Sequence, residues 1–507
     1  MDIAIKKENY KLLQTIKENS IEECVEADFS LPEYMPEILR IIKYTAQPKI
    51  NSCKAVGERV TVDGECELRM IYTAEDGGIY SFSQTKPFTR HCENAIFNDA
   101  VDINGEIQVS YVNCRATSTK RAEIKAGLVI KVVAFVEEKE EIISLEGNSC
   151  IEEKCIPVRA MSLGCKKTRA FSMSDTLTLS THCAFIISAR AGAVCTEIKK
   201  ISNKVMIKGD AIIEICYVTS ADKTCTEHIR HSLPINQILE FEGMEERFTG
   251  NVALNITAVD VIQKNEQDGT GTAFDIALGI DASLCMWEEK ELTVINDAYA
   301  VGGSIDLKKN TYMFFTPLDE FRDTYVFRND FQVSGEGVSK VLNSTCELSN
   351  VTVKKENDIL CLCGSLTVSA LIKDSSGSIS NVNKIFDIKY ERKADYDGSE
   401  IFSMPDLTVL SLDCVEKSNN GIDVRAEIGV SATVFGKVFI DTITDITESE
   451  NQEKRKLNAI TVYFPEKSES LWSIARRYNT TVTAIAEENN LTGDTTENLK
   501  MIFIPAV

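Results

Sequence analysis

The stretch GLVIKVVAFV, residues 127–136, places an apolar side chain at every second position from Leu128 to Ala134. Alternation with a period of two residues is typical of a β strand that packs one face on a core. The same pattern returns at 278–284 and at 428–434, each time 150 residues further along the chain. The sequence therefore predicts three equivalent strands, at 124–136, 274–286 and 424–434.

A second landmark supports an internal repeat. Gly64, Gly209 and Gly364 each interrupt a strand-like run, and glycine inside a strand often marks a bulge or a close backbone approach. Both landmarks recur in the same order, so we expect a mainly β chain with three divergent copies of one domain, each of about 150 residues. The expected domains are 1–150, 151–303 and 304–446, followed by a linker at 447–458 and a small C-terminal unit at 459–507.

Two segments flank the copies. The first copy opens on ENYKLLQTIKENSIEECVEADFSLPEYMPEILRIIKY, in which we predict a helical segment followed by a stretch paced by Pro32 and Pro36. The third copy is followed by TESENQEKRK, residues 447–456, which has no apolar residue. Such a segment cannot bury a core, and we interpret it as a charged linker.

Composition and charge narrow the class of protein. The 507 residues are 43% apolar and 26% charged, as in ordinary folded proteins, and are numerous enough for several domains. The net charge of −22 repels phosphate backbones and anionic lipid, so nucleic acid is not expected as a partner. The most apolar run is ten residues long and contains Lys131, which is too short for a membrane span, so direct membrane insertion is not expected.

The cysteines and the N-terminal residues favour a cytosolic location. Seventeen cysteines, an odd number, are scattered through strand-like runs, whereas secreted disulfide frameworks are shorter and denser in cysteine. The first residues, MDIAIKKENYKLLQ, show neither the apolar core nor the cleavage site of a secretory signal. We therefore expect reduced thiols and no disulfide.

The C-terminal unit combines two short helices with two short strands. Its first helix is predicted by apolar residues at i, i+3, i+4 and i+7, and the second helix repeats that spacing. Ser470 and Thr481 are available as N-caps, and AITVYF and MIFIP predict the flanking strands, which gives the order βααβ. The predicted core of the first helix is Leu471, Ile474, Ala475 and Tyr478, and the second helix carries Val482, Ile485, Ala486 and Asn489.

That order, with SLWSIARRYNTTVTAIAEENNL inside it and FIP at its close, resembles a LysM domain over about residues 459–506. The resemblance implies a module that, in most relatives, holds N-acetylglucosamine-containing glycans between the loop after the first strand and the loop after the second helix. On that side this sequence has Ser468, Glu469 and Ser470 where relatives have Gly-Asp-Thr, and Leu499 where they have glycine. Glycine permits close ligand approach that serine and leucine do not.

The whole chain resembles the SipL-type spore coat morphogenetic proteins, whose repeats are known as SPOCS or DUF3794 domains. The segment DFSLPEYMPEILRIIKYTAQPKI and the repeat layout carry the resemblance. It implies an adaptor, made in the mother-cell cytoplasm and placed at the forespore surface or spore coat. It also implies that the LysM unit binds the stage IV sporulation morphogenetic ATPase, with other coat proteins as further partners. The altered groove fits a LysM unit that has been reassigned to a protein partner.

Four residues of this unit are candidates for partner binding. Trp472 is turned about 100° from the apolar stripe of its helix, with Arg476 on the same i, i+4 face. Tyr463 and Phe464 end the first strand of the unit. Because large aromatic and arginine side chains dominate binding hot spots, we expect these four to contact the ATPase.

The sequence offers little support for catalysis. None of the four histidines falls in a recognisable motif, and His91 and His182 each precede a cysteine in a strand-like run, where neighbours point to opposite faces. Zinc requires clustered ligands such as paired C-x-x-C, and no phosphate-binding loop of the Walker type is present. We expect no enzymatic activity, cofactor or metal. The alternative function is a cell-wall protein that binds peptidoglycan glycan.

Overall fold

Almost the whole chain folds into β strands. The computed structural model describes residues 3–147, 150–220, 222–265, 272–335, 337–396, 401–418, 420–449, 460–466, 469–491 and 500–505. The first copy forms β1 Ile5–Ser30, β2 Arg40–Val56, β3 Arg59–Thr73, β4 Ile79–Glu93, a 3-10 turn at Ala95–Asp99, β5 Ala100–Ser118 and β6 Arg121–Leu145. The second forms β7 Ile151–Leu179, β8 Cys183–Ile201, β9 Lys204–Thr219, β10 Thr226–Glu240, β11 Thr249–Asn265 and β12 Thr272–Ala300. The third forms β13 Ile305–Gln332, β14 Val338–Glu356, β15 Ile359–Asp374, β16 Ile379–Lys393, β17 Ile401–Lys417 and β18 Gly421–Glu448.

Each copy is a sandwich of two antiparallel three-stranded sheets. One sheet of each copy has the order β1-β6-β5, β11-β12-β7 or β13-β18-β17, and the other has β2-β3-β4, β10-β9-β8 or β14-β15-β16. The three alternating segments of the sequence lie in β6, β12 and β18, the central strand of the first sheet in each copy. The structure confirms a mainly β fold of tandem repeats.

The alternating residues fill the sandwich core. In the first copy Leu128 and Ile130 of β6 belong to one apolar cluster with Val60, Val62 and Leu68 of β3. Equivalent clusters lie inside the second and third copies. Because only every second residue of β6 turns inward, the pattern that predicts the strand also determines which face is buried.

The repeated glycines lie where neighbouring backbones come close. Gly64 and Gly209 face irregularities in the pairing of the adjacent strand. A β-carbon at Gly64 would lie 2.5 Å from the carbonyl oxygen of Lys49, and one at Gly209 would lie 1.9 Å from that of Val194. The close approach predicted from the sequence is therefore present at both positions.

The predicted helical segment near the N-terminus is wrong. Residues 5–30 are instead the strand β1, which pairs with β6 from Ile5–Leu145 to Ser30–Arg121. At its end, Val25, Ala27 and Phe29 alternate into the core of the first copy. The Leu-, Glu- and Lys-rich residues that precede Val25 favour a helix, but each contributes only a small free energy. Pairing along the whole length of β6 outweighs that preference.

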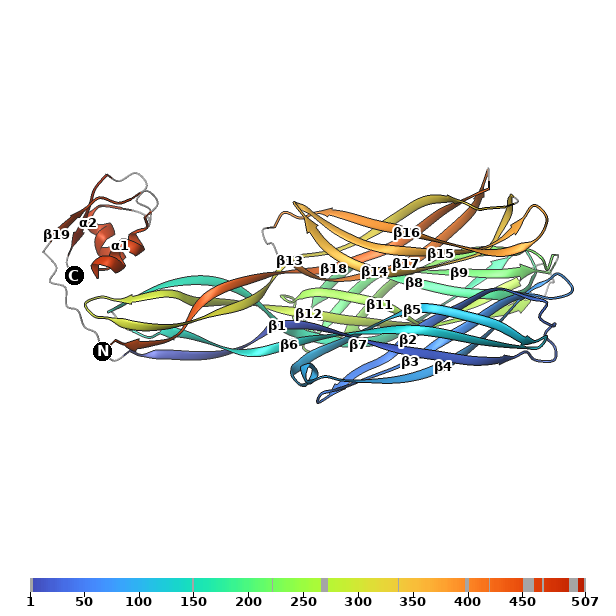
Figure 1. Cartoon of the computed structure of the whole chain (residues 1–507), viewed down its shortest axis with the longest axis horizontal. Coiled ribbons are helices and arrows are strands. Elements are labelled where there is room, and N and C mark those ends of the chain that lie inside the picture. Colours follow the sequence, from blue (N-terminus) through green and yellow to red (C-terminus); the bar gives the residue numbers. More distant parts are fainter. Residues whose placement is uncertain are drawn as a thin grey trace.

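The longest strands continue beyond the sandwiches and form a stem. Ribbons from β1/β6, β7/β12 and β13/β18 run side by side away from the body toward the C-terminal unit (Figure 1). Phe135, Trp287 and Phe435, one from each central strand, meet with ring centroids 5.5 and 5.6 Å apart. The copies thus share an apolar core with approximate threefold symmetry, in addition to the core inside each sandwich.

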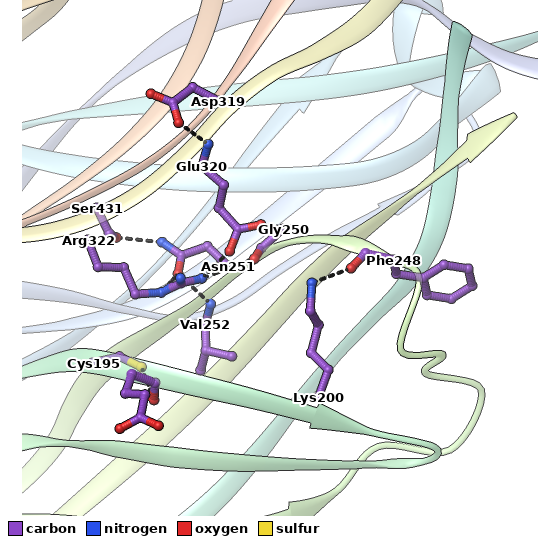
Figure 2. A network of polar contacts seen from close by, with 11 residues as sticks. Cys195, Lys200, Phe248, Gly250, Asn251, Val252, Asp319, Glu320, Arg322 and Ser431 are labelled. Carbon is purple, nitrogen blue, oxygen red and sulfur yellow. Dashed lines mark hydrogen bonds and ion pairs between the residues drawn. The ribbon is translucent and has the colours of Figure 1, made fainter. Parts of the chain in front are cut away.

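A polar network joins the second and third copies (Figure 2). The Arg322 guanidinium donates to Asn251 Oδ1 at 2.9 Å, to the Gly250 carbonyl at 3.1 Å and to Glu320 Oε1 at 2.7 Å. Glu320 accepts in turn from the Gly250 amide at 2.9 Å, and Asn251 donates to Ser431 Oγ at 2.5 Å. The network fixes the start of β11 against β13 and β18.

Replacing Arg322 by alanine is expected to lower the free energy of unfolding by about 1.5 kcal/mol, because three donors are lost and Glu320 keeps an uncompensated charge. The Arg322 side chain is only 14% exposed, so water replaces these bonds poorly. Urea unfolding followed by circular dichroism measures the loss. Arg328→Ala, at an exposed position of the same strand, is the matched control. Equal stability of the two variants would contradict the prediction.

Candidate partner-binding site

The C-terminal unit is a small βααβ domain. It consists of β19 Ile460–Tyr463, α1 Leu471–Tyr478, α2 Val482–Glu488 and β20 Ile502–Pro505, with β19 and β20 antiparallel. The predicted N-caps are in place: Ser470 Oγ accepts from the Ser473 amide at 3.2 Å, and Thr481 Oγ1 from the Ala484 amide at 2.9 Å. These bonds satisfy amides that the first turn of each helix leaves unpaired.

The predicted core of α1 is largely confirmed. Leu471, Ile474 and Ala475 are buried and pack with α2 and β20 in one apolar cluster. Tyr478 is only partly buried and lies at the edge, with its ring centroid 5.5 Å from that of Tyr463.

Of the helices in the described part of the chain, none has the length and apolarity needed to cross a bilayer.

Trp472 and Arg476 lie on the predicted common face of α1, and both contact the end of the stem. Trp472 Nε1 donates to Asp297 Oδ2 at 2.9 Å, and Arg476 Nη1 reaches the same oxygen at 2.8 Å. Asp297 is in β12, near the end of the stem in the second copy. One carboxylate therefore holds both of the α1 residues proposed for partner binding.

Tyr299 completes this contact. Its ring meets that of Trp472 edge to face with centroids 4.9 Å apart, and its hydroxyl donates to the Thr480 carbonyl at 2.9 Å. Tyr299 is 6% exposed and belongs to the apolar cluster of the small domain. We call Asp297 and Tyr299 the stem tip; it docks the domain with an ion pair, hydrogen bonds and aromatic packing.

The charge at the stem tip is stable at neutral pH. Burial raises the pKa of the Asp297 carboxyl, but the Trp472 hydrogen bond and the charges of Arg476 and Lys309 outweigh it and hold the pKa below its usual range. A carboxylate with a lowered pKa stabilises the docked arrangement above its ordinary pKa, and the contribution is lost as the pH falls. The contact is therefore charged and intact at neutral pH.

The two remaining predicted residues lie on another side of the domain. The Tyr463 hydroxyl donates to Glu469 Oε2 at 2.8 Å and accepts from Arg477 Nη1 at 2.7 Å, which holds the ring against the domain. Phe464 is 67% exposed. The structure thus brings Trp472 and Arg476 together and leaves Phe464 apart from the stem tip.

Sequence reasoning missed an exposed apolar face around Phe464. Ile460 and Val462 of β19 are about half exposed, as is Phe503, which pairs directly with Val462. Residues 460 and 462 share one side of β19, and Phe464 follows directly after the strand. The alternation in AITVYF was the signal, but it does not reveal which side of a two-stranded sheet is left uncovered.

The two loops expected to form a glycan groove are only partly defined. Ser468 and Leu499 lie outside the described residues. If the α1 face is not the contact surface, the sequence offers the loop at 490–494 as the next candidate, and its residues 492–494 lie outside the described part as well. Most of the expected linker, 450–458, also lies outside the described residues. Across the described residues no group of three or more His, Cys, Asp or Glu side chains is arranged to hold a metal ion.

Comparison with protein families identifies two kinds of module. The SipL SPOCS domain matches residues 37–117 and 185–263, which cover β2–β5 and β8–β11, and the LysM domain matches residues 466–500. Two segments of the chain are thus similar to the SPOCS domain and one to the LysM domain, both families of non-catalytic modules. The matches confirm the resemblance to SipL-type proteins and fit a sporulation protein associated with the coat. Comparison with curated proteins and with solved structures gave no match.

The structure adds a third copy to the two that the SPOCS family matches. Strands β14–β17 occupy the same places in the third sandwich as β2–β5 and β8–β11 in the first two. The third copy differs in sequence at landmarks such as the EEKE that follows the alternating strand in the first two. It nevertheless keeps the strand order and contributes one ribbon to the stem.

Proposed function

We propose that this chain is a non-enzymatic sporulation adaptor that binds the stage IV sporulation coat-basement ATPase through its LysM domain. In this proposal it works in the mother-cell cytoplasm at the forespore surface, where it helps to localise the spore coat. The combination of SPOCS and LysM domains supports the sporulation role. The observation that carries the choice of a protein partner is the α1 face, which already makes a protein contact of mixed polar and aromatic character.

The ATPase would take the place of the stem tip on this face. Trp472 and Arg476 supply a large ring and a charged donor, the side-chain types that dominate hot spots. In the free protein both side chains donate to Asp297, so binding of the ATPase to this face requires the stem tip to leave it. The apolar face of Ile460, Val462 and Phe464 offers further contact area for a large partner without that release.

The alternative function is binding of peptidoglycan glycan, which the match to the LysM family favours. In such a case the ligand would contact the loops after β19 and α2 rather than the α1 face. Serine and glutamate at 468–470 and leucine at 499 replace the residues usual in glycan-binding relatives. We therefore place the protein partner first.

The proposal is tested with the purified ATPase of the same organism and two forms of this protein, the full chain and residues 1–449. The full chain is expected to retain the ATPase in a pull-down, whereas the shortened form, checked for folding by circular dichroism, is expected to lose it. Binding that survives removal of the LysM domain would contradict the proposal. Saturable sedimentation of the full chain alone with peptidoglycan would favour the alternative.

A further inference from the structure

Residues of all three copies line a cavity of about 310 Å³. Strands β2, β8 and β14 each contribute to its lining. At equivalent places these strands carry an irregularity in pairing, at Ile42, Ile187 and Leu342, whose buried side chains meet in one apolar cluster. The cavity therefore lies on the approximate threefold axis, next to this cluster.

The residues that follow these irregularities form two rings of equivalent positions. Lys43, Ser188 and Asn343 form the first ring: Lys43 Nζ donates to Asn343 Oδ1 at 3.0 Å, and Asn343 Nδ2 donates to Ser188 Oγ at 3.3 Å. Two residues further along each strand, the second ring consists of Thr45, Arg190 and Thr345. All six residues line the cavity. Each ring thus combines one cation with two neutral polar residues.

Of the two cations, Arg190 has a carboxylate partner and Lys43 has none among the described residues. Arg190 Nε donates to Glu214 Oε2 at 2.6 Å, and the other oxygen of Glu214 accepts from the Leu412 amide at 2.9 Å. Lys43 is 2% exposed, and among the described residues no carboxylate forms an ion pair with it. Its ammonium donates to Asn343 and to the Ser369 carbonyl, the latter at 3.1 Å.

This arrangement is electrostatically unbalanced. Burial, and after it the positive charge of Arg190, lowers the pKa of Lys43 to about 7. A buried ammonium without a counterion is costly, and an anion between it and Arg190 would relieve both the desolvation and the repulsion. The other lysine and arginine side chains of the lining, Arg69, Arg230 and Lys340, each have their own glutamate. Among the lysines and arginines of the lining, Lys43 is therefore the one without a carboxylate partner in the described part of the chain.

We propose that this cavity is a binding site for a small oxyanion, a carboxylate- or phosphate-bearing molecule held by Lys43 and Arg190. The hydroxyls of Thr45 and Thr345 are the polar groups of the lining in the same ring as Arg190. The volume is at the lower end of the range for small-molecule sites, which limits the ligand to a small anion. Glu227 and Asp413, both exposed, also line the cavity. The site belongs to the SPOCS copies and is independent of the LysM domain.

The test measures thermal unfolding of the full chain with inorganic phosphate or malonate, each against sodium chloride at the same ionic strength. At about 100 times the dissociation constant, the anion that binds is expected to raise the unfolding midpoint by roughly 3 °C. Comparing the two anions distinguishes a phosphate from a carboxylate ligand. Lys43→Met is expected to abolish the shift.

Lys49→Met is the matched control. Lys49 also joins two copies, through a 2.8 Å bond to the Thr257 carbonyl, but it does not line the cavity, so the shift should persist. An equal shift in the Lys43 variant and the wild type would overturn the proposal. Isothermal titration of the wild-type chain decides the question if the Lys43 variant fails to fold. One saturable site per chain for either anion is the expected result, and the absence of saturable binding for both would also overturn the proposal.

Discussion

Replacing Trp287 by alanine is expected to lower the free energy of unfolding by about 3–5 kcal/mol. Trp287 is fully buried in the core that the three copies share, where its ring meets Phe135 and Phe435 of the other two copies. Truncation would leave a cavity that no single copy can close, because each side of it belongs to a different copy. Urea unfolding, followed by circular dichroism and by a second probe, measures the loss.

Trp287→Phe is the matched control for this prediction. Phenylalanine keeps an aromatic ring at this position, next to the rings of Phe135 and Phe435. In the described part of the chain the indole N–H of Trp287 has no hydrogen-bond partner, and its removal offsets part of the lost ring volume. We expect a loss below about 1.5 kcal/mol. A similar loss for alanine and phenylalanine would show that the stem core does not join the copies.

Trp472→Ala is expected to weaken binding of the ATPase by on the order of 30-fold, the equivalent of about 2 kcal/mol at a hot spot. Asp297→Ala is expected to act in the opposite direction. It keeps Trp472 and Arg476 but removes the carboxylate that holds them in the free protein. Moving the stem tip away from the α1 face then requires less free energy, and the affinity for the ATPase should rise several-fold. Both affinities can be measured by surface-immobilised binding of the full chain.

Arg477→Ala controls for the loss of a charge from α1. Arg477 neighbours Arg476 in sequence but reaches Tyr463 and Glu469, away from the stem tip. Its replacement should change ATPase affinity far less than Arg476→Ala does. If Trp472→Ala and Arg476→Ala both fold and bind as the wild type does, the α1 face is not the partner surface. If Asp297→Ala lowers affinity, the partner recognises the docked arrangement instead.

The sequence was most informative where burial is periodic. Alternation from Leu128 to Ala134 and its two later copies predicted the central strands, because one face of each is buried in a sandwich. The same rule could have corrected the first strand, since Val25, Ala27 and Phe29 also alternate. The preceding residues favour helix on local propensity alone, and only pairing with β6, more than one hundred residues later, overrides it.

The candidate site was predictable on one side only. Helix geometry places Trp472 and Arg476 on a common face of α1, and the structure agrees. Their contact with Asp297 joins residues 175 and 179 positions apart, and no local pattern encodes such a distance. The cavity residue Lys43 was equally invisible, because its neighbours Ser188 and Asn343 belong to other copies.

The continuity of β12 has a mechanical consequence. This single strand of 29 residues, roughly 95 Å at the usual rise per residue, runs from the sandwich of the second copy to the residues that hold the LysM domain. Its ladder bonds to β7 and β11 lie across the strand direction. A pull on the docked domain along the stem would load these bonds together in shear instead of opening them one after another. An adaptor fixed at one end to a growing protein layer would therefore bear tension through the strand itself, and the docking contact at Asp297 would yield first.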